Sequence, residues 1–171
     1  MAIATHTGDS PSRTRRQHYT LSVLPSESEI ADLCLEIHLE LMEIWTETEL
    51  AENRAFDAMS NRRVSELDLQ RRILEKLSLR CADQYNRFYS AIANWFGRAG
   101  IDRASNEVIR LSGFAFGQEL YEFKNRCVLS PLILDIMKGL RTELEALHHH
   151  VIPNLAALLE ERFPYAVAAA V

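Results

Sequence analysis

The chain has 171 residues, of which 47% are hydrophobic and 25% are charged. This is enough apolar sequence for one ordinary domain with a buried core, and the length is too short to expect two such domains. A formal net charge of −5 does not favour a nucleic-acid-binding protein. The sequence also has no apolar run of about eighteen residues, so no membrane-spanning helix is predicted.

The first 25 residues are predicted to form a flexible basic tail. Gly8, Pro11 and Pro25 interrupt any helix, and the apolar residues follow no period. No apolar stretch precedes a cleavage site, so a secretory signal is not expected and the mature chain is expected to begin here. The basic cluster favours either a solvated tail or contact with an acidic partner or a phosphate; it consists of Arg13, Arg15 and Arg16.

The first helix is predicted from Ser26 to about Ser60. Ser26 and Glu29 match a capping box. A row of apolar and small residues then recurs at alternating intervals of four and three, and we call it the seam of this helix: Ile30, Cys34, Ile37, Leu41, Ile44, Thr48, Ala51, Ala55 and Ala58. Such a row predicts a long helix that packs lengthwise against others.

Three more helices are predicted after it. The second runs from about Ser65 to Phe96 and ends at the glycines of residues 97–100. The third begins after Asp102, and its Gly113 and Gly117 indicate a close helix crossing, a bend or a site for a small apolar ligand. The fourth opens at Ser130 and Pro131, with the predicted seam Ile133, Met137, Leu140, Leu144, Leu147, Val151, Leu155 and Leu158.

No strand alternation competes with these helices. Four long helices with short connections predict an all-α fold, an antiparallel helical bundle. The chain is thus expected to divide into the flexible basic tail, residues 1–25, and a single helical-bundle domain, residues 26–171.

Charge differs sharply between the first two helices. Residues 27–57 contain ten acidic side chains and one basic side chain, a net charge of −9, whereas residues 61–98 contain eight basic and four acidic, a net charge of +4. Antiparallel neighbours of opposite charge would select each other, so this pattern favours pairing within the fold over an external basic partner.

The first helix carries more apolar surface than one seam needs. Leu35, Leu39 and Met42 are again spaced by four and three, and Leu33 and Trp45 lie beside them. A helix with two apolar faces is either central in its bundle or pairs with a second subunit. We therefore predict a homodimer whose interface includes Leu35, Leu39, Met42 and Trp45.

Residues 148–150 are three consecutive histidines on the fourth helix. Glu145 and His148 share one helix face, and His38 of the first helix would complete a mixed carboxylate and imidazole metal site if the two helices packed there. His148 also fits a hydrogen-bonded packing residue or a pH-sensitive interface group. Pro153 is expected to bend the helix, because it cannot donate to the carbonyl of His149.

The three cysteines, Cys34, Cys81 and Cys127, lie 47 and 46 residues apart and match no metal or disulfide spacing. They are predicted to be reduced core thiols of a cytoplasmic protein. The sequence contains no phosphate-binding loop, dinucleotide fingerprint, nucleophile elbow or zinc-protease motif, and enzymatic activity is left open.

These features predict a non-enzymatic regulatory, adaptor or assembly protein that acts in the cytoplasm through protein–protein binding, as a homodimer and with a further protein partner. Neither a membrane nor a nucleic acid is the expected partner. The alternative is a bundle that binds a metal or a haem-like cofactor through His148, although the sequence identifies no particular cofactor.

Overall fold

The computed structural model describes residues 23–101 and 113–162, and these residues form helices without any strand. The elements are α1 (Glu27–Ser60), α2 (Val64–Arg98), α4 (Gly113–Cys127), α5 (Pro131–Ala146), the π-helix η1 (Leu147–Val151) and α6 (Ile152–Arg162). The predicted all-α fold is confirmed. Residues 1–22 of the predicted tail lie outside the described residues. None of the described helices combines the length and the apolar character needed to cross a membrane.

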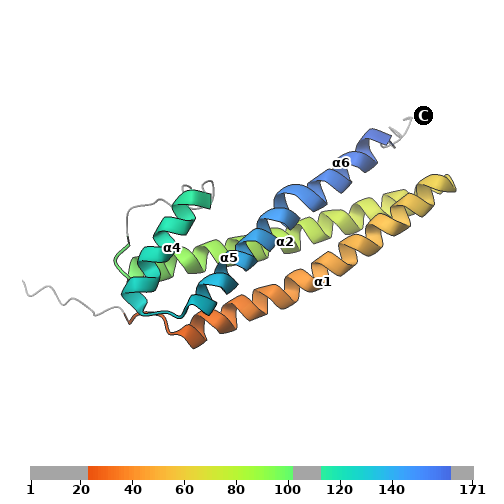
Figure 1. Ribbon diagram of the computed structural model, residues 1–171. Helices are drawn as coiled ribbons and strands as arrows, with labels where there is room; N and C mark the ends of the chain where they lie inside the picture. The colour runs from red at the N-terminus through yellow and green to blue at the C-terminus, as the bar shows by residue number, and fades with distance from the viewer. Residues whose placement is uncertain (1–22, 102–112, 163–171) are drawn as a thin grey trace, which may run out of the picture.

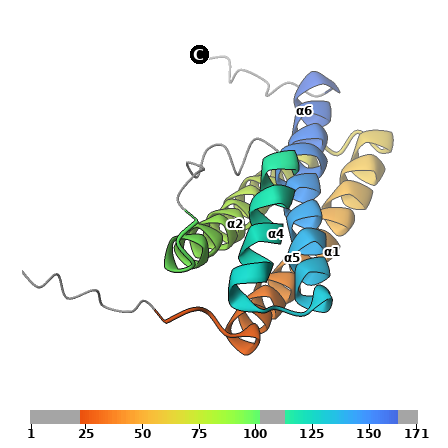
Figure 2. The ribbon, with the colours of Figure 1, turned by 60° about the vertical axis from the view of Figure 1, so that its left-hand side comes forward.

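Two long helices and one composite rod make the bundle (Figure 1). α1 and α2 form an antiparallel hairpin, and α5, η1 and α6 continue into one another and pack along both. α4 lies at the end of the bundle where α2 finishes and α5 begins (Figure 2). Phe123 of α4 packs against Phe96, with ring centroids 5.1 Å apart and the ring planes tilted by 50°. Gly117 makes no close crossing, because a Cβ there would meet no atom within 4 Å.

All nine seam residues of α1 are buried, as the spacing predicts. Its final positions, Ala51, Ala55 and Ala58, are small, so α2 can approach closely near the turn that joins the two helices. Thr48 is the polar member of the row, and its hydroxyl donates to the carbonyl of Ile44 at 2.7 Å. The buried hydroxyl is therefore satisfied within its own helix.

Opposite charges pair α1 with α2, as the charge pattern predicts. Arg80 contacts three carboxylates of α1, at 2.7 Å from Glu40, 2.8 Å from Glu47 and 3.4 Å from Glu43. Two further pairs, Arg87 with Glu36 and Arg98 with Glu29, follow the same antiparallel order. Five acidic residues of α1 are thus paired with three arginines of α2 inside the molecule.

The start of α1 follows the expected capping chemistry, whereas Ser130, before Pro131 at the start of α5, makes no side-chain capping hydrogen bond. Ser26 Oγ accepts a hydrogen bond from the backbone N–H of Glu29 at 3.1 Å. The pKa of Glu29 is lowered, chiefly by its hydrogen bond from Arg98, and the backbone of Ser26 contributes to this shift. At the end of α2, Gly100 has φ +74°, a left-handed conformation that favours glycine.

The composite rod α5–η1–α6 departs from the predicted seam at its π-helix, η1. Ile133, Met137, Leu140, Leu144, Leu147 and Leu155 are buried as predicted. Val151 and Leu158 are only half-buried, and their neighbours Ile152 and Leu159 are buried instead. A π-turn holds one more residue than an α-turn, as the bond from Ile152 N–H to the Leu147 carbonyl shows. The extra residue advances the buried face by one position beyond it.

Candidate functional site

The exposed apolar face of α1 is the first component of the candidate site. The exposed fractions of Leu35, Leu39, Met42 and Trp45 are 57%, 54%, 55% and 39%. Leu35, Met42 and Trp45 line hollows between α1 and α5, whereas Leu39 lines neither of them. Leu132 and Ile136 of α5 are also exposed and extend the apolar surface onto that helix.

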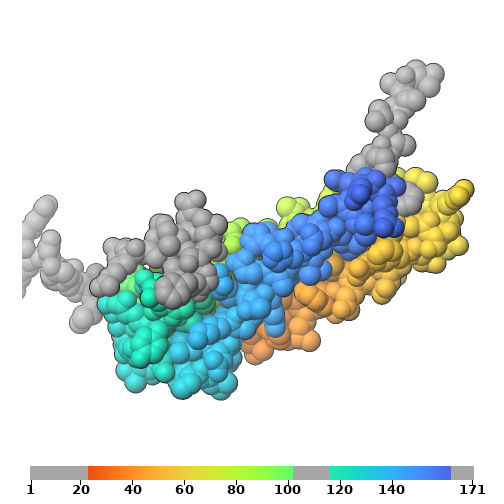
Figure 3. Space-filling model, turned by 45° about the horizontal axis from the view of Figure 1, so that its top comes forward, coloured from red at the N-terminus to blue at the C-terminus, as the bar shows by residue number. Residues whose placement is uncertain are grey.

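A trough runs between α1 and α5, which lie side by side on the face that Figure 3 shows. It consists of two hollows with volumes of about 450 Å³ and about 300 Å³. Both are lined by His38 and Glu143, so they adjoin one another. The larger also contacts Ala31, Cys34, Leu35, Asp135, Ile136, Gly139 and Leu140. The smaller also contacts Leu41, Met42, Trp45, Thr46 and Leu147.

One polar bridge crosses the trough. His38 Nδ1 lies 2.9 Å from Glu143 Oε2, and both side chains are partly open to solvent. The linings contain no lysine or arginine, and Asp135 adds a second carboxylate. The trough is therefore apolar along its walls, with carboxylates at the rim.

The histidine run forms a second cluster, where η1 packs on α2. The rings of His148 and Tyr85 have centroids 4.6 Å apart, and His149 Nε2 lies 3.4 Å from the hydroxyl of Tyr85. Glu145 accepts a 2.6 Å hydrogen bond from the hydroxyl of Tyr89 and lies 3.3 Å from His149 Nε2. The side chains of this cluster thus bind one another.

The surroundings of His148 favour its neutral form. The pKa of His148 is lowered, first by burial and then by the neighbouring His149, although Glu145 opposes the shift. Burial also raises the pKa of Tyr89, and its bond to Glu145 adds to the effect. A neutral histidine packed against a tyrosine ring fits the predicted packing role.

The three residues predicted to bind a metal have different neighbours. His38 pairs with Glu143, whereas Glu145 contacts Tyr89 and His149. Within residues 23–101 and 113–162, no three His, Cys, Asp or Glu side chains are grouped so that they could hold a metal ion. A metal at Glu145, His148 and His38 stays a prediction.

The cysteines are free thiols, and two of them belong to the core. Burial raises the pKa of Cys34 and of Cys81 to about 11 in each case. Cys127 is half-buried, and burial raises its pKa as well. A thiol held protonated is a poor nucleophile, so the contact of Cys34 with the trough does not make it reactive.

Sequence reasoning named only the α1 half of the trough. Leu132 and Ile136 are spaced by four and lie off the seam of α5, and this is the signal that could have revealed the other half. The pairing of His38 with Glu143 has no comparable signal, because 105 residues separate the two in the chain.

Comparison with known proteins adds no relative: the chain matches no family model, no curated protein and no solved structure.

Proposed function

We propose that this protein is a cytoplasmic regulator, adaptor or assembly factor that binds proteins through the apolar face of α1 and the adjoining trough, and that its first partner is a second copy of itself. The observation that carries this proposal is the exposure of Leu35, Leu39, Met42 and Trp45 beside an apolar trough. Contiguous exposed apolar surface of this kind is typical of protein interfaces.

The geometry suits a helix as the occupant. The α1 wall of the trough extends from Ala31 to Thr46, about 22 Å at ~1.5 Å per residue. Grooves between two helices accept the apolar stripe of a third, with anchors at intervals of three and four residues. Leu35, Leu39 and Met42 have this spacing themselves.

If two copies are related by a twofold axis, the exposed apolar face of α1 in each copy would lie in the trough of the other copy. In such an isologous contact, each α1 supplies both anchors and wall. Many of the carboxylates of α1 face α2 and are already paired with Arg80, Arg87 or Arg98, which limits the like-charge repulsion between two acidic helices.

The test is the molar mass of the purified protein over a concentration series, measured by light scattering or sedimentation. Leu39→Glu is expected to weaken association, because it places a charge in the centre of the exposed apolar face of α1. Leu69→Glu is the matched control, since Leu69 is a similarly exposed leucine on α2. A wild-type mass that stays monomeric at high concentration, or equal weakening by both variants, would contradict the proposed dimer.

The alternative function, binding of a metal or haem-like cofactor, rests on the histidine cluster at η1. π-turns occur frequently at functional sites, and His148 and His149 lie on this one. Elemental analysis and an absorbance spectrum of untagged protein test it. Stoichiometric metal or a visible band that is lost in His148→Ala would support this function in place of, or beside, the first.

A further inference from the structure

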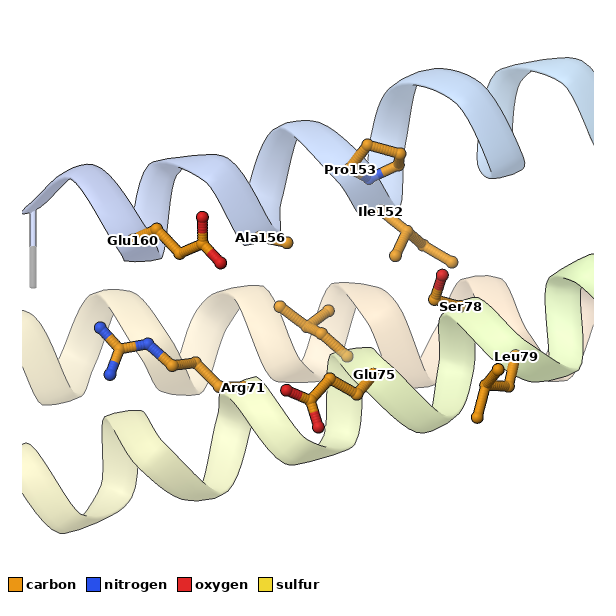
Figure 4. Close-up of a pocket in the computed structure, with 9 residues that line it drawn as sticks. Arg71, Glu75, Ser78, Leu79, Ile152, Pro153, Ala156 and Glu160 are labelled. Atoms are coloured by element: carbon orange, nitrogen blue, oxygen red, sulfur yellow. The ribbon is translucent and has the colours of Figure 1, made fainter. Parts of the chain in front are cut away.

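A hollow of about 420 Å³ lies between α2 and α6, on a part of the molecule distinct from the α1–α5 trough (Figure 4). Its floor is apolar, with the buried side chains of Leu74 and Ile152. Small residues open it, since Ser78 and Ala156 stand where larger side chains would fill the gap. At one end Leu79 of α2 is 69% exposed.

The charged groups around this hollow do not call for a charged ligand. Arg71 lies at one end, where its Nη1 is 2.8 Å from Asp68 Oδ1 and its Nη2 donates to the carbonyl of Leu159 at 3.0 Å. Its positive charge is therefore already compensated. The carboxylates of Glu75 and Glu160 are exposed beside the hollow and would repel an acidic occupant. An uncharged, apolar occupant fits best.

Such a segment follows directly in the chain. Residues 163–171 read Phe-Pro-Tyr-Ala-Val-Ala-Ala-Ala-Val, without a charged side chain and with two aromatic rings at the start. They begin at the end of α6, three residues beyond Glu160 of the lining. Pro164 disfavours continuation of α6 through Phe163, which allows the chain to turn back.

Residues 163–171 are long enough to extend along the whole hollow. Nine residues span up to ~30 Å when extended. The hollow follows α6 from Glu160 back to Ile152, which is about 12 Å of helix. We infer that residues 163–171 fold back along α6 and occupy the α2–α6 hollow of their own chain. Phe163 and Tyr165 are the anchors, and Leu79 is one of the residues that the whole segment covers.

Disulfide trapping in the full-length chain tests this placement. Ala168→Cys keeps both aromatic anchors and lies far enough along the segment to reach the far end of the hollow; it is combined with Leu79→Cys in one variant and with Leu69→Cys in the matched control. Both variants also carry Cys127→Ser, which removes the one natural cysteine that is not fully buried, since Cys34 and Cys81 are. Leu69 is exposed on α2 but does not line the hollow, and it lies nearer than Leu79 to Arg71, which contacts the end of α6. If residues 163–171 did not dock in the hollow, their cysteine would therefore reach position 69 at least as easily as position 79.

The expected result is an intramolecular disulfide that forms about tenfold faster with Leu79→Cys than with Leu69→Cys, because docking raises the local thiol concentration. Equal rates, or a faster reaction at position 69, would overturn the inference. A disulfide at Leu79→Cys that joins two chains would also overturn it, because the segment would then dock on another copy.

A thermal coupling measurement provides an independent readout. Phe163→Ser with Tyr165→Ser is expected to lower Tm by about 2–4 °C. The same pair of substitutions should have no effect when Ala156→Leu or Ala156→Phe already fills the hollow. If the two serine substitutions lower Tm by the same amount in a folded Ala156→Leu or Ala156→Phe variant, the aromatic rings act elsewhere.

Discussion

His148 is half-buried among Tyr85, His149 and Glu145, so its protonation is linked to folding. Its pKa in the folded state lies below its unfolded value of 6.5. In the interval between the two values the unfolded chain binds more protons, so stability is complete above pH 6.5 and declines as the pH falls toward the folded pKa.

We therefore expect the wild-type protein to lose more thermal stability than His148→Gln between about pH 7.5 and about pH 5.5. Glutamine keeps a polar side chain but does not titrate. The measurement is Tm by circular dichroism at intervals through this range. Parallel curves for the two proteins would mean that His148 carries no folding-linked proton.

Two glycines in different backbone conformations should respond oppositely to alanine. A Cβ on Gly139, in α5, would meet no atom within 4 Å. Gly139→Ala is thus expected to stabilise the protein by about 0.5–1 kcal/mol, because alanine loses less backbone entropy in a helix.

At Gly100 φ is +74°, and a Cβ would lie 3.1 Å from Arg126 Nη1. Gly100→Ala is expected to cost about 1–2 kcal/mol for the left-handed conformation alone. Urea unfolding of both variants measures the contrast. A loss at Gly139→Ala would indicate that the trough beside it is narrower than it is in the structure.

At the scale of one element, the rod α5–η1–α6 shows what periodicity alone cannot supply. The missing N–H of Pro153 predicted a bend near His149, and the structure has a π-turn there; a bend and an inserted residue are both ways to accommodate the proline. Which one forms depends on how Leu147, Ile152 and Leu159 pack against the other helices. A count of intervals of three and four carried through residues 147–151 therefore selects Val151 and Leu158 in place of the buried Ile152 and Leu159.

Leu158 and Leu159 provide a matched test of this register shift. Leu159 is fully buried, whereas Leu158, the position that an uninterrupted seam predicts, is half-buried. Leu159→Ala should destabilise the protein by about 2–5 kcal/mol, and Leu158→Ala by less than half as much. Urea unfolding compares the two identical substitutions. The reverse order would mean that the helix continues without the π-turn.

At the scale of the whole molecule, local pattern predicted the elements and the inward face of α1, because both depend on residues within a few turns of one another. The salt bridges between α1 and α2 followed from net charges of opposite sign on adjacent helices. The site needed tertiary information. Two contacts depend on which helix lies beside α1 and on how the two helices are offset along their axes. These are the hollow that Leu35 shares with Ile136 and Gly139, and the pairing of His38 with Glu143.

Trp45 allows the proposed self-association to be followed at this scale. It lines the trough, is partly exposed and donates its indole N–H to Glu49 Oε1 at 3.0 Å, whereas the other tryptophan, Trp95, is buried in the core. If a second copy covers the stripe, rising protein concentration should shift the emission of Trp45 to shorter wavelength and reduce its quenching by acrylamide, because the ring leaves water. Leu39→Glu should abolish both changes, and Trp45→Phe should leave only the constant signal of Trp95. A mass that doubles while the emission of Trp45 stays constant would mean that the copies associate through another face, since an indole covered by the contact would leave water.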